Sequence, residues 1–273
     1  MVQSLDETQE NVSQTRARDA ADIVPASHHL EDCHVQGAGP PLIYVPGLDG
    51  TGLLFYRQAR LLARRFRVIT FRLRDEARDM DTLVAEIARH LDMAVPDRTP
   101  AIVVGESFGG ALAMHFALSH PERVRALVVL NSFTRITPKI KLYAAIAATS
   151  IVPWGAMGIV RRFTGARLQS SHTHRDEIRR FLLLTRAITR EGYTNRLRIL
   201  TRYDLRERLK DIRVPTLFLA ADEDHLIPSV EQATYMAARV PGAIVRILKG
   251  HGHGCFLAPD LDLDVILQEW GGR

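Results

Sequence analysis

The feature that most constrains this chain is the alternation of short apolar runs with longer segments of helical periodicity. The runs are rich in aliphatic residues, as strands buried on both faces must be. Such strands with helices between them predict an α/β fold, in which helices flank a mostly parallel central sheet. The predicted strands are Leu42–Val45, Val68–Phe71, Ile102–Val104, Ala126–Leu130, Thr216–Ala220 and Ile244–Leu248. The predicted helices are Leu53–Arg64, Leu83–Met93, Phe108–Leu118, Val230–Arg239 and Leu261–Trp270.

The alternation stops after Leu130 and resumes at Thr216. Between them, helical patterns occur at Lys139–Val152, Asp176–Thr189 and Tyr193–Thr201. We predict that this insertion, at about residues 132–204, is a helical lid over the strand ends, where an open α/β sheet holds its active site.

Within the insertion, the run Leu142–Val160 has no charged residue. Its length raises the question of a membrane span, but Pro153 and two glycines interrupt it and basic residues flank both ends. A hydrophobic lid segment that faces the pocket and binds an acyl chain is the better interpretation.

The N-terminal residues 1–26 are polar and contain no apolar core of the length a signal peptide needs. We expect a flexible tail there, followed by one domain over residues 27–273. The only two cysteines, Cys33 and Cys255, are far apart and form no CxxC pair. This pattern argues against a zinc module and favours a reducing compartment, so we expect a cytoplasmic protein.

Charge is unevenly distributed along the chain. The formal net charge is +5, yet residues 132–204 hold 14 Lys or Arg against four Asp or Glu. No nucleic-acid recognition motif accompanies them, so we expect no nucleic-acid partner. The excess is either a solvated arginine-rich face or a surface that attracts an anionic partner, such as a lipid surface or an acidic carrier.

The strongest motif is Gly105-Glu106-Ser107-Phe108-Gly109. It lies between a predicted strand and a predicted helix, where a sharp turn exposes a serine hydroxyl. Positions two before and two after the serine must be small in such a turn, and both are glycine. A serine held in this way beside a base is an activated nucleophile.

From about Leu42 to the C-terminus the chain resembles the α/β-hydrolase family. The loop PGLDGTG at Pro46–Gly52, together with GESFGG, is similar to phytyl-ester-synthase-like hydrolases, although their HxxxxD acyltransferase signature is absent. The resemblance implies that Ser107 is the nucleophile and that the backbone N–H groups of Leu48 and Phe108 form the oxyanion hole. Pro46 stands where the family usually has a histidine.

The family order places an acid and then a histidine after the nucleophile. Asp224, four residues before Pro228, fits the family spacing for the acid better than Asp222. For the histidine, His253 before Cys255-Phe256-Leu257 fits better than His251, and the second member of each pair stays open. Glycines around both histidines indicate a loop rather than a metal-binding strand, so we expect no metal and no cofactor.

The resemblance implies a serine hydrolase that cleaves carboxylic esters with an apolar acyl chain through an acyl-enzyme. A thioesterase or acyltransferase acting on CoA- or carrier-bound acyl groups shares the same residues and is the alternative. A non-catalytic binding protein on this fold is disfavoured by the intact serine, acid and histidine. The expected partner is a small-molecule acyl substrate, and the residues predict neither its identity nor the oligomeric state.

Overall fold

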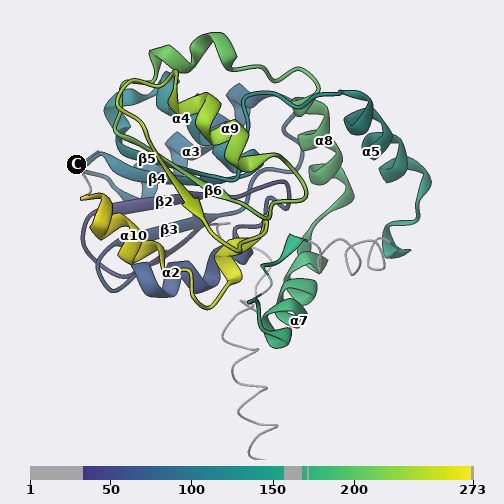
Figure 1. Cartoon of the computed structure of the whole chain (residues 1–273), viewed down its shortest axis with the longest axis horizontal. Coiled ribbons are helices and arrows are strands. Elements are labelled where there is room, and N and C mark those ends of the chain that lie inside the picture. Colours follow the sequence, from purple (N-terminus) through teal and green to yellow (C-terminus); the bar gives the residue numbers. More distant parts are fainter. Residues whose placement is uncertain (1–32, 157–167, 171, 272–273) are drawn as a thin grey trace, which may run out of the picture. The chain divides into compact units, whose positions relative to one another are not determined.

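The computed structural model describes residues 33–156, 168–170 and 172–271 (Figure 1). The predicted tail, residues 1–26, lies outside the described residues. Seven strands form one sheet in the order β1-β3-β2-β4-β5-β6-β7. All neighbouring pairs are parallel except β1 with β3, so the predicted α/β fold with a mostly parallel sheet is confirmed. The strands are β1 Cys33–Gln36, β2 Pro41–Val45, β3 Arg67–Phe71, β4 Ala101–Glu106, β5 Val124–Leu130, β6 Thr216–Ala221 and β7 Ile244–Leu248.

Strand β1 was not among the strands expected from the sequence. It is a short edge strand that pairs antiparallel with β3, and three of its four residues are exposed. A strand with so little burial needs no continuous apolar run, so the pattern of apolar runs does not predict it.

Helices cover both faces of the sheet, and strand β2 shows how its side chains divide between them. Ile43 and Val45 join the core beneath one group of helices, whereas Leu42 and Tyr44 join the core on the other face. The first group is α3 Met80–Ala94, α4 Phe108–Ser119 and α9 Ser229–Ala237. The second is α2 Tyr56–Leu62 and α10 Leu263–Trp270, which lie side by side (Figure 1).

Between β5 and β6 the regular secondary structure of the described residues is entirely helical. It comprises α5 Ile140–Ile151, α7 Arg175–Leu184 and α8 Arg190–Leu200, with 3-10 turns at Trp154–Ala156, Thr185–Ala187 and Arg206–Asp211. Helix α5 contacts α8 through Thr194, whose hydroxyl donates to that of Thr149 at 3.0 Å. On α5 the side chains of Ile140, Tyr143 and Ile151 are exposed. Residues 157–160 of the uncharged run lie outside the described residues.

None of the helices in the described part of the chain combines the length and the apolar character needed to span a bilayer.

Gln58 of α2 ties that helix to the C-terminal segment and leads to a stability prediction. Its side chain is fully buried, donates to the carbonyls of Phe256 (3.0 Å) and Leu261 (2.9 Å), and accepts from the N–H of Leu263 (2.9 Å). Gln58→Leu leaves three buried backbone groups without partners, so we expect a loss of about 3 kcal/mol or more in urea unfolding. Gln268→Leu, which removes an exposed hydrogen bond to Asp264, should cost less than about 0.5 kcal/mol. Equal losses would contradict this account.

Candidate active site

Ser107 stands at the turn between β4 and α4 in a backbone conformation that residues with a side chain rarely adopt. Its φ is 55° and its ψ is −119°, a geometry that costs on the order of 1–3 kcal/mol. The N–H of Ser107 donates to the Leu130 carbonyl at 2.9 Å, and the Ser132 hydroxyl donates to the Ser107 carbonyl at 2.7 Å. These bonds hold Ser107 at the carboxyl end of β4, with 8% of the residue exposed.

The glycines of the GESFGG motif allow this turn to pack closely. A Cβ atom at Gly105 would lie 2.3 Å from the Gly109 carbonyl oxygen, and one at Gly109 would lie 2.1 Å from the carbonyl oxygen of Val45. Neither position has room for a side chain. The spacing seen in the sequence is therefore a steric requirement of this turn.

An acid and a histidine meet beyond the ends of β6 and β7. Nδ1 of His253 lies 2.7 Å from Oδ2 of Asp224. The other oxygen of Asp224 accepts from the backbone N–H groups of Leu226 (2.9 Å) and Ile227 (3.1 Å), and the Ser229 hydroxyl donates to Oδ2. Burial alone would raise the pKa of Asp224, but hydrogen bonds from His253, Ser229 and Leu226 lower it below its usual value. The carboxyl group is therefore ionised at neutral pH.

The neighbouring acid, Asp222, has a different set of partners. Its Oδ1 accepts from the N–H of Gly250 at 2.7 Å, and its Oδ2 lies 3.4 Å from Nζ of Lys249. These contacts connect the loop after β6 to the loop after β7 and use the carboxylate structurally.

The neighbouring histidine, His251, also points to other groups. Its Nδ1 lies 3.0 Å from the hydroxyl of Ser170, and its Nε2 lies 3.7 Å from Asp260. Burial lowers the pKa of His251. The structure thus pairs Asp224 with His253 and directs Asp222 and His251 elsewhere, while the catalytic roles of all four stay predictions.

Asn131, which the sequence analysis did not single out, connects these parts. It directly follows Leu130 and has a φ of 45°, a left-handed conformation that asparagine tolerates. Its amide nitrogen donates to the His253 carbonyl at 2.8 Å, and its amide oxygen accepts from the Ala221 N–H at 2.8 Å. One side chain therefore joins the ends of β5 and β6 to the His253 loop. The signal in the sequence that could have pointed to Asn131 is its position immediately after a buried strand, at the sheet edge that carries the site.

The loop after β2 lies beside Ser107. A Cβ atom at Gly47 would lie 3.8 Å from Cβ of Ser107. The N–H of Gly50 donates to the Gly47 carbonyl at 3.0 Å, which closes a turn. In a trans peptide the carbonyl and the following N–H point in opposite directions, so the Leu48 N–H faces away from this turn. Phe108 begins α4, where backbone N–H groups have no acceptor within the helix. Oxyanion binding by Leu48 and Phe108 stays a prediction.

Glu106 directly precedes Ser107 and is partly buried. The Tyr44 hydroxyl donates to its Oε2 at 3.1 Å. Burial raises the pKa of Glu106 to about 7, His253 opposes the shift, and Asp49 adds to it. A carboxyl group next to Ser107 thus changes its charge near neutral pH.

Cys255 and the two histidines before it do not form a metal site. The thiol is buried, and burial raises its pKa well above the ordinary value, so it stays protonated and is a poor ligand or nucleophile. Among residues 33–156, 168–170 and 172–271, no three His, Cys, Asp or Glu side chains are grouped as metal binding requires.

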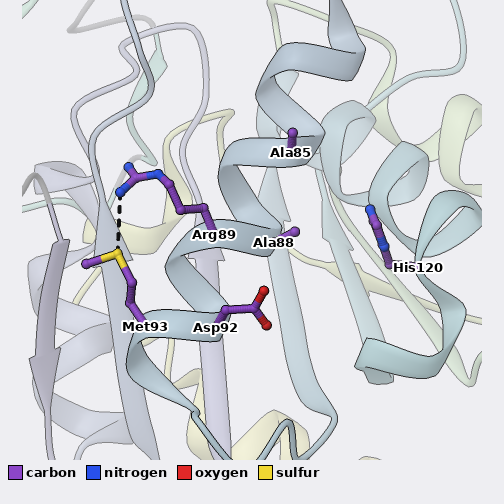
Figure 2. Close-up of a pocket in the computed structure, with 6 residues that line it drawn as sticks. All are labelled: Ala85, Ala88, Arg89, Asp92, Met93 and His120. Carbon is purple, nitrogen blue, oxygen red and sulfur yellow. Dashed lines mark hydrogen bonds between the residues drawn. The ribbon is translucent and has the colours of Figure 1, made fainter.

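A surface pocket of about 520 Å³ lies between α3 and the end of α4 (Figure 2). It is lined by Ala85, Ala88, Arg89, Asp92, Met93 and His120. His120 follows the last residue of α4 and Ser107 precedes the first, and a helix of 12 residues is about 18 Å long. The pocket is therefore at the opposite end of α4 from Ser107, and we assign it no part in the chemistry.

The protonation of Glu106 leads to a prediction about stability. In the folded protein this group keeps its proton up to about pH 7, whereas its ordinary pKa is 4.5. Between these values the unfolded chain binds fewer protons, so stability falls as the pH rises. Glu106→Gln removes this loss, and its stability relative to wild type should increase from pH 5 to pH 8 by more than about 1 kcal/mol. Urea unfolding at pH 5 and pH 8 measures this difference in the free energy of unfolding, with Glu122→Gln at an exposed position as the control. A difference independent of pH would refute it.

Comparison with known proteins shows the family. The profile described as "Alpha/beta hydrolase family" matches residues 42–262. "Polyketide synthase ThaQ" of Burkholderia thailandensis is 28% identical over 81% of this chain, which spans only 11% of that protein. "Putative carbamate hydrolase RutD" of Azorhizobium caulinodans is 28% identical, over 85% of this chain and 92% of the relative. "Phytyl ester synthase 1, chloroplastic" of Arabidopsis thaliana is 24% identical, over 85% of this chain and 37% of its own length.

Among solved structures, a hydrolase from Pseudomonas aeruginosa matches with a TM-score of 0.77 at 22% identity, over 88% of this chain and 93% of that one. At this identity the likeness shows a shared fold. The profile match covers most of the chain, and the resemblance to phytyl-ester-synthase-like hydrolases has a counterpart among the relatives. This chain belongs to the α/β hydrolase family.

Proposed function

We propose that this chain is a serine hydrolase that cleaves carboxylic esters with an apolar acyl chain. The observation that carries the proposal is the 2.7 Å hydrogen bond between His253 and Asp224, at the sheet edge where Ser107 is held in a strained turn. The Leu130 carbonyl holds the Ser107 N–H, and the next residue, Asn131, holds the His253 carbonyl. The proposed nucleophile and base are therefore both bonded to the end of β5.

In the proposed mechanism, Oγ of Ser107 attacks the ester carbonyl carbon and its proton passes to Nε2 of His253. Nε2 is the acceptor because Nδ1 faces Asp224, whose charge stabilises the imidazolium. The N–H groups of Leu48 and Phe108 stabilise the oxyanion. His253 then gives its proton to the leaving alkoxide, and an acyl-enzyme remains. A water then loses a proton to His253 and attacks the acyl carbon. The bond from that carbon to Oγ breaks and His253 returns the proton to Oγ, so the acid is released and Ser107 is restored.

We further propose that the helical insertion between β5 and β6 acts as a lid. Its residues contact the His253 loop directly: the Leu168 carbonyl accepts from the Gly254 N–H at 2.7 Å, and the Ser170 hydroxyl accepts from the Gly252 N–H at 3.2 Å. A long uncharged run in the same insertion suits an apolar acyl chain, and each methylene that the chain buries contributes about 0.8 kcal/mol of binding.

A second candidate is a thioesterase or acyltransferase that acts on CoA- or carrier-bound acyl groups. The observation that favours it is the 14 basic against four acidic residues at 132–204, which suit an anionic substrate or carrier. Acyl-CoA thioesters and nitrophenyl esters of increasing chain length, tested side by side, separate thioester from ester cleavage.

We also propose a cytoplasmic location, since only two cysteines occur and they are far apart in the sequence.

The nucleophile assignment leads to a direct prediction. Ser107→Ala removes the attacking oxygen, and we expect turnover of the preferred nitrophenyl ester to fall by about 10³-fold or more. A fluorophosphonate probe should label the wild-type protein at Ser107, and the variant should not react. Urea unfolding of Ser107→Ala serves as the folding control. Wild-type turnover in a folded Ser107→Ala protein would end the serine-hydrolase proposal.

The acid and base assignments are tested with neighbouring pairs. His253→Ala and Asp224→Asn should impair turnover strongly, and Asp224→Asn less than His253→Ala, because the acid orients the base and does not react itself. The matched variants His251→Ala and Asp222→Asn should keep most of the turnover, since their partners are Ser170 and Gly250. Measuring kcat for all four decides the matter. The reverse order within either pair would reassign that residue.

A further inference from the structure

A buried arginine of the insertion binds the loop that carries Leu48. Arg196 lies on α8, and its side chain is only 1% exposed. Its Nε donates to the Leu48 carbonyl at 3.0 Å, and its Nη2 donates to the Asp49 carbonyl at 3.2 Å. One guanidinium group therefore holds two successive carbonyls of the loop after β2.

The guanidinium is itself held by Asp75, which follows β3. Nη1 of Arg196 lies 3.3 Å from Oδ1 of Asp75. Arg72 donates to the other oxygen of Asp75 at 2.8 Å, and the Asn195 amide donates to the Asp75 carbonyl at 2.9 Å. Burial opposes ionisation of Asp75, but hydrogen bonds from Arg72 and Thr189 and the charges of Arg72 and Arg196 lower the pKa of its carboxyl group, so the carboxylate is ionised.

Two glycines make room for this ion pair. Gly50 has a φ of 67°, and a Cβ atom there would lie 2.3 Å from Cζ of Arg196. A Cβ atom at Gly192, on α8, would lie 1.9 Å from Oδ1 of Asp75. Loop and helix therefore approach each other at positions where a Cβ atom would displace the ion pair.

The contacts fix the peptide groups on both sides of Leu48. The Gly47–Leu48 peptide, which contains the Leu48 N–H, is held because the Gly47 carbonyl accepts from Gly50. The Leu48–Asp49 peptide is held by the bond from Arg196 to the Leu48 carbonyl. Each peptide group is planar, so holding both leaves the Leu48 N–H little freedom to rotate. Without Arg196, only the first of these restraints remains.

We propose that Arg196 is a positioning residue that keeps the Leu48 N–H oriented toward the oxyanion formed at Ser107. The inference rests on the proposed function and adds that an insertion residue sets the geometry of the catalytic loop. Loss of one oxyanion donor costs about 10²–10³ in kcat. Loosening such a donor should cost part of that, about tenfold or more, with KM changed less than about threefold because the ground-state carbonyl depends on it less.

The test compares Arg196→Lys and Arg196→Met with wild type on a nitrophenyl ester. Lysine keeps the charge beside Asp75, but a single ammonium lacks the planar fork that reaches two carbonyls and a carboxylate. We expect kcat to fall in both variants, more in Arg196→Met, and KM to hold. The inhibition constant of a boronic acid, whose tetrahedral adduct with serine carries the oxyanion charge, should rise in parallel with the loss in kcat.

Arg123→Lys is the matched control. Arg123 is 3% exposed, is paired with Asp92, and lies near the opposite end of α4 from Ser107. The Arg123→Lys variant should have a lower Tm than wild type but the same kcat and the same inhibition constant for the boronic acid. Asp75→Asn, which keeps the arginine but removes the charge that holds it, should show the same pattern as Arg196→Lys with a smaller loss and serves if the lysine variant does not fold.

The outcomes are distinct. A fall in Tm with unchanged kcat and boronic-acid inhibition would make Arg196 a purely structural brace and overturn the inference. A rise in KM alone would make it a substrate-binding residue and overturn it as well. If folded Ser107→Ala keeps its turnover, the proposed function fails whatever the Arg196 variants do.

Discussion

The close approach of α4 to the ends of β2 and β4 is the constraint on which the site depends. Gly105 and Gly109 make it possible, because a Cβ atom at either position would overlap backbone atoms. Only with this approach does the chain turn sharply enough to hold Ser107 at a φ of 55°. The energy of that conformation is offset by bonds from neighbouring strand ends, so the serine cannot relax without loosening the sheet edge.

Parallel pairing brings the remaining groups to the same edge. Strands β4, β5, β6 and β7 are neighbours in the sheet, and Ser107, Asn131, Asp224 and His253 all follow their carboxyl ends. Asn131 turns this proximity into a fixed arrangement, because its amide bonds to both the end of β6 and the His253 carbonyl. The candidate acid and base then need only short loops to meet.

Described residues of the insertion bond to the loops at this edge. Leu168 and Ser170 bond to the loop that bears His253, and Arg196 bonds to the loop that bears Leu48. A segment expected to select the substrate therefore also contacts both loops of the candidate chemistry. If the proposed function holds, a substitution in the insertion would alter the rate of reaction as well as the choice of acyl chain.

The sequence by itself determined the alternation of strands and helices, the serine turn and the family, because burial on both sheet faces and tight glycine packing leave local patterns. It also favoured Asp224 and His253 from spacing, yet it left Asp222 and His251 open, since neighbours in one loop share every local property. Only the tertiary structure showed that Asp224 bonds to His253, whereas Asp222 and His251 bond to other groups. Strand β1 was beyond the sequence because its residues are mostly exposed and form no apolar run. Asn131 and the Arg196–Asp75 pair were beyond it because their partners are distant along the chain, and hydrogen bonds between distant residues leave no periodic pattern.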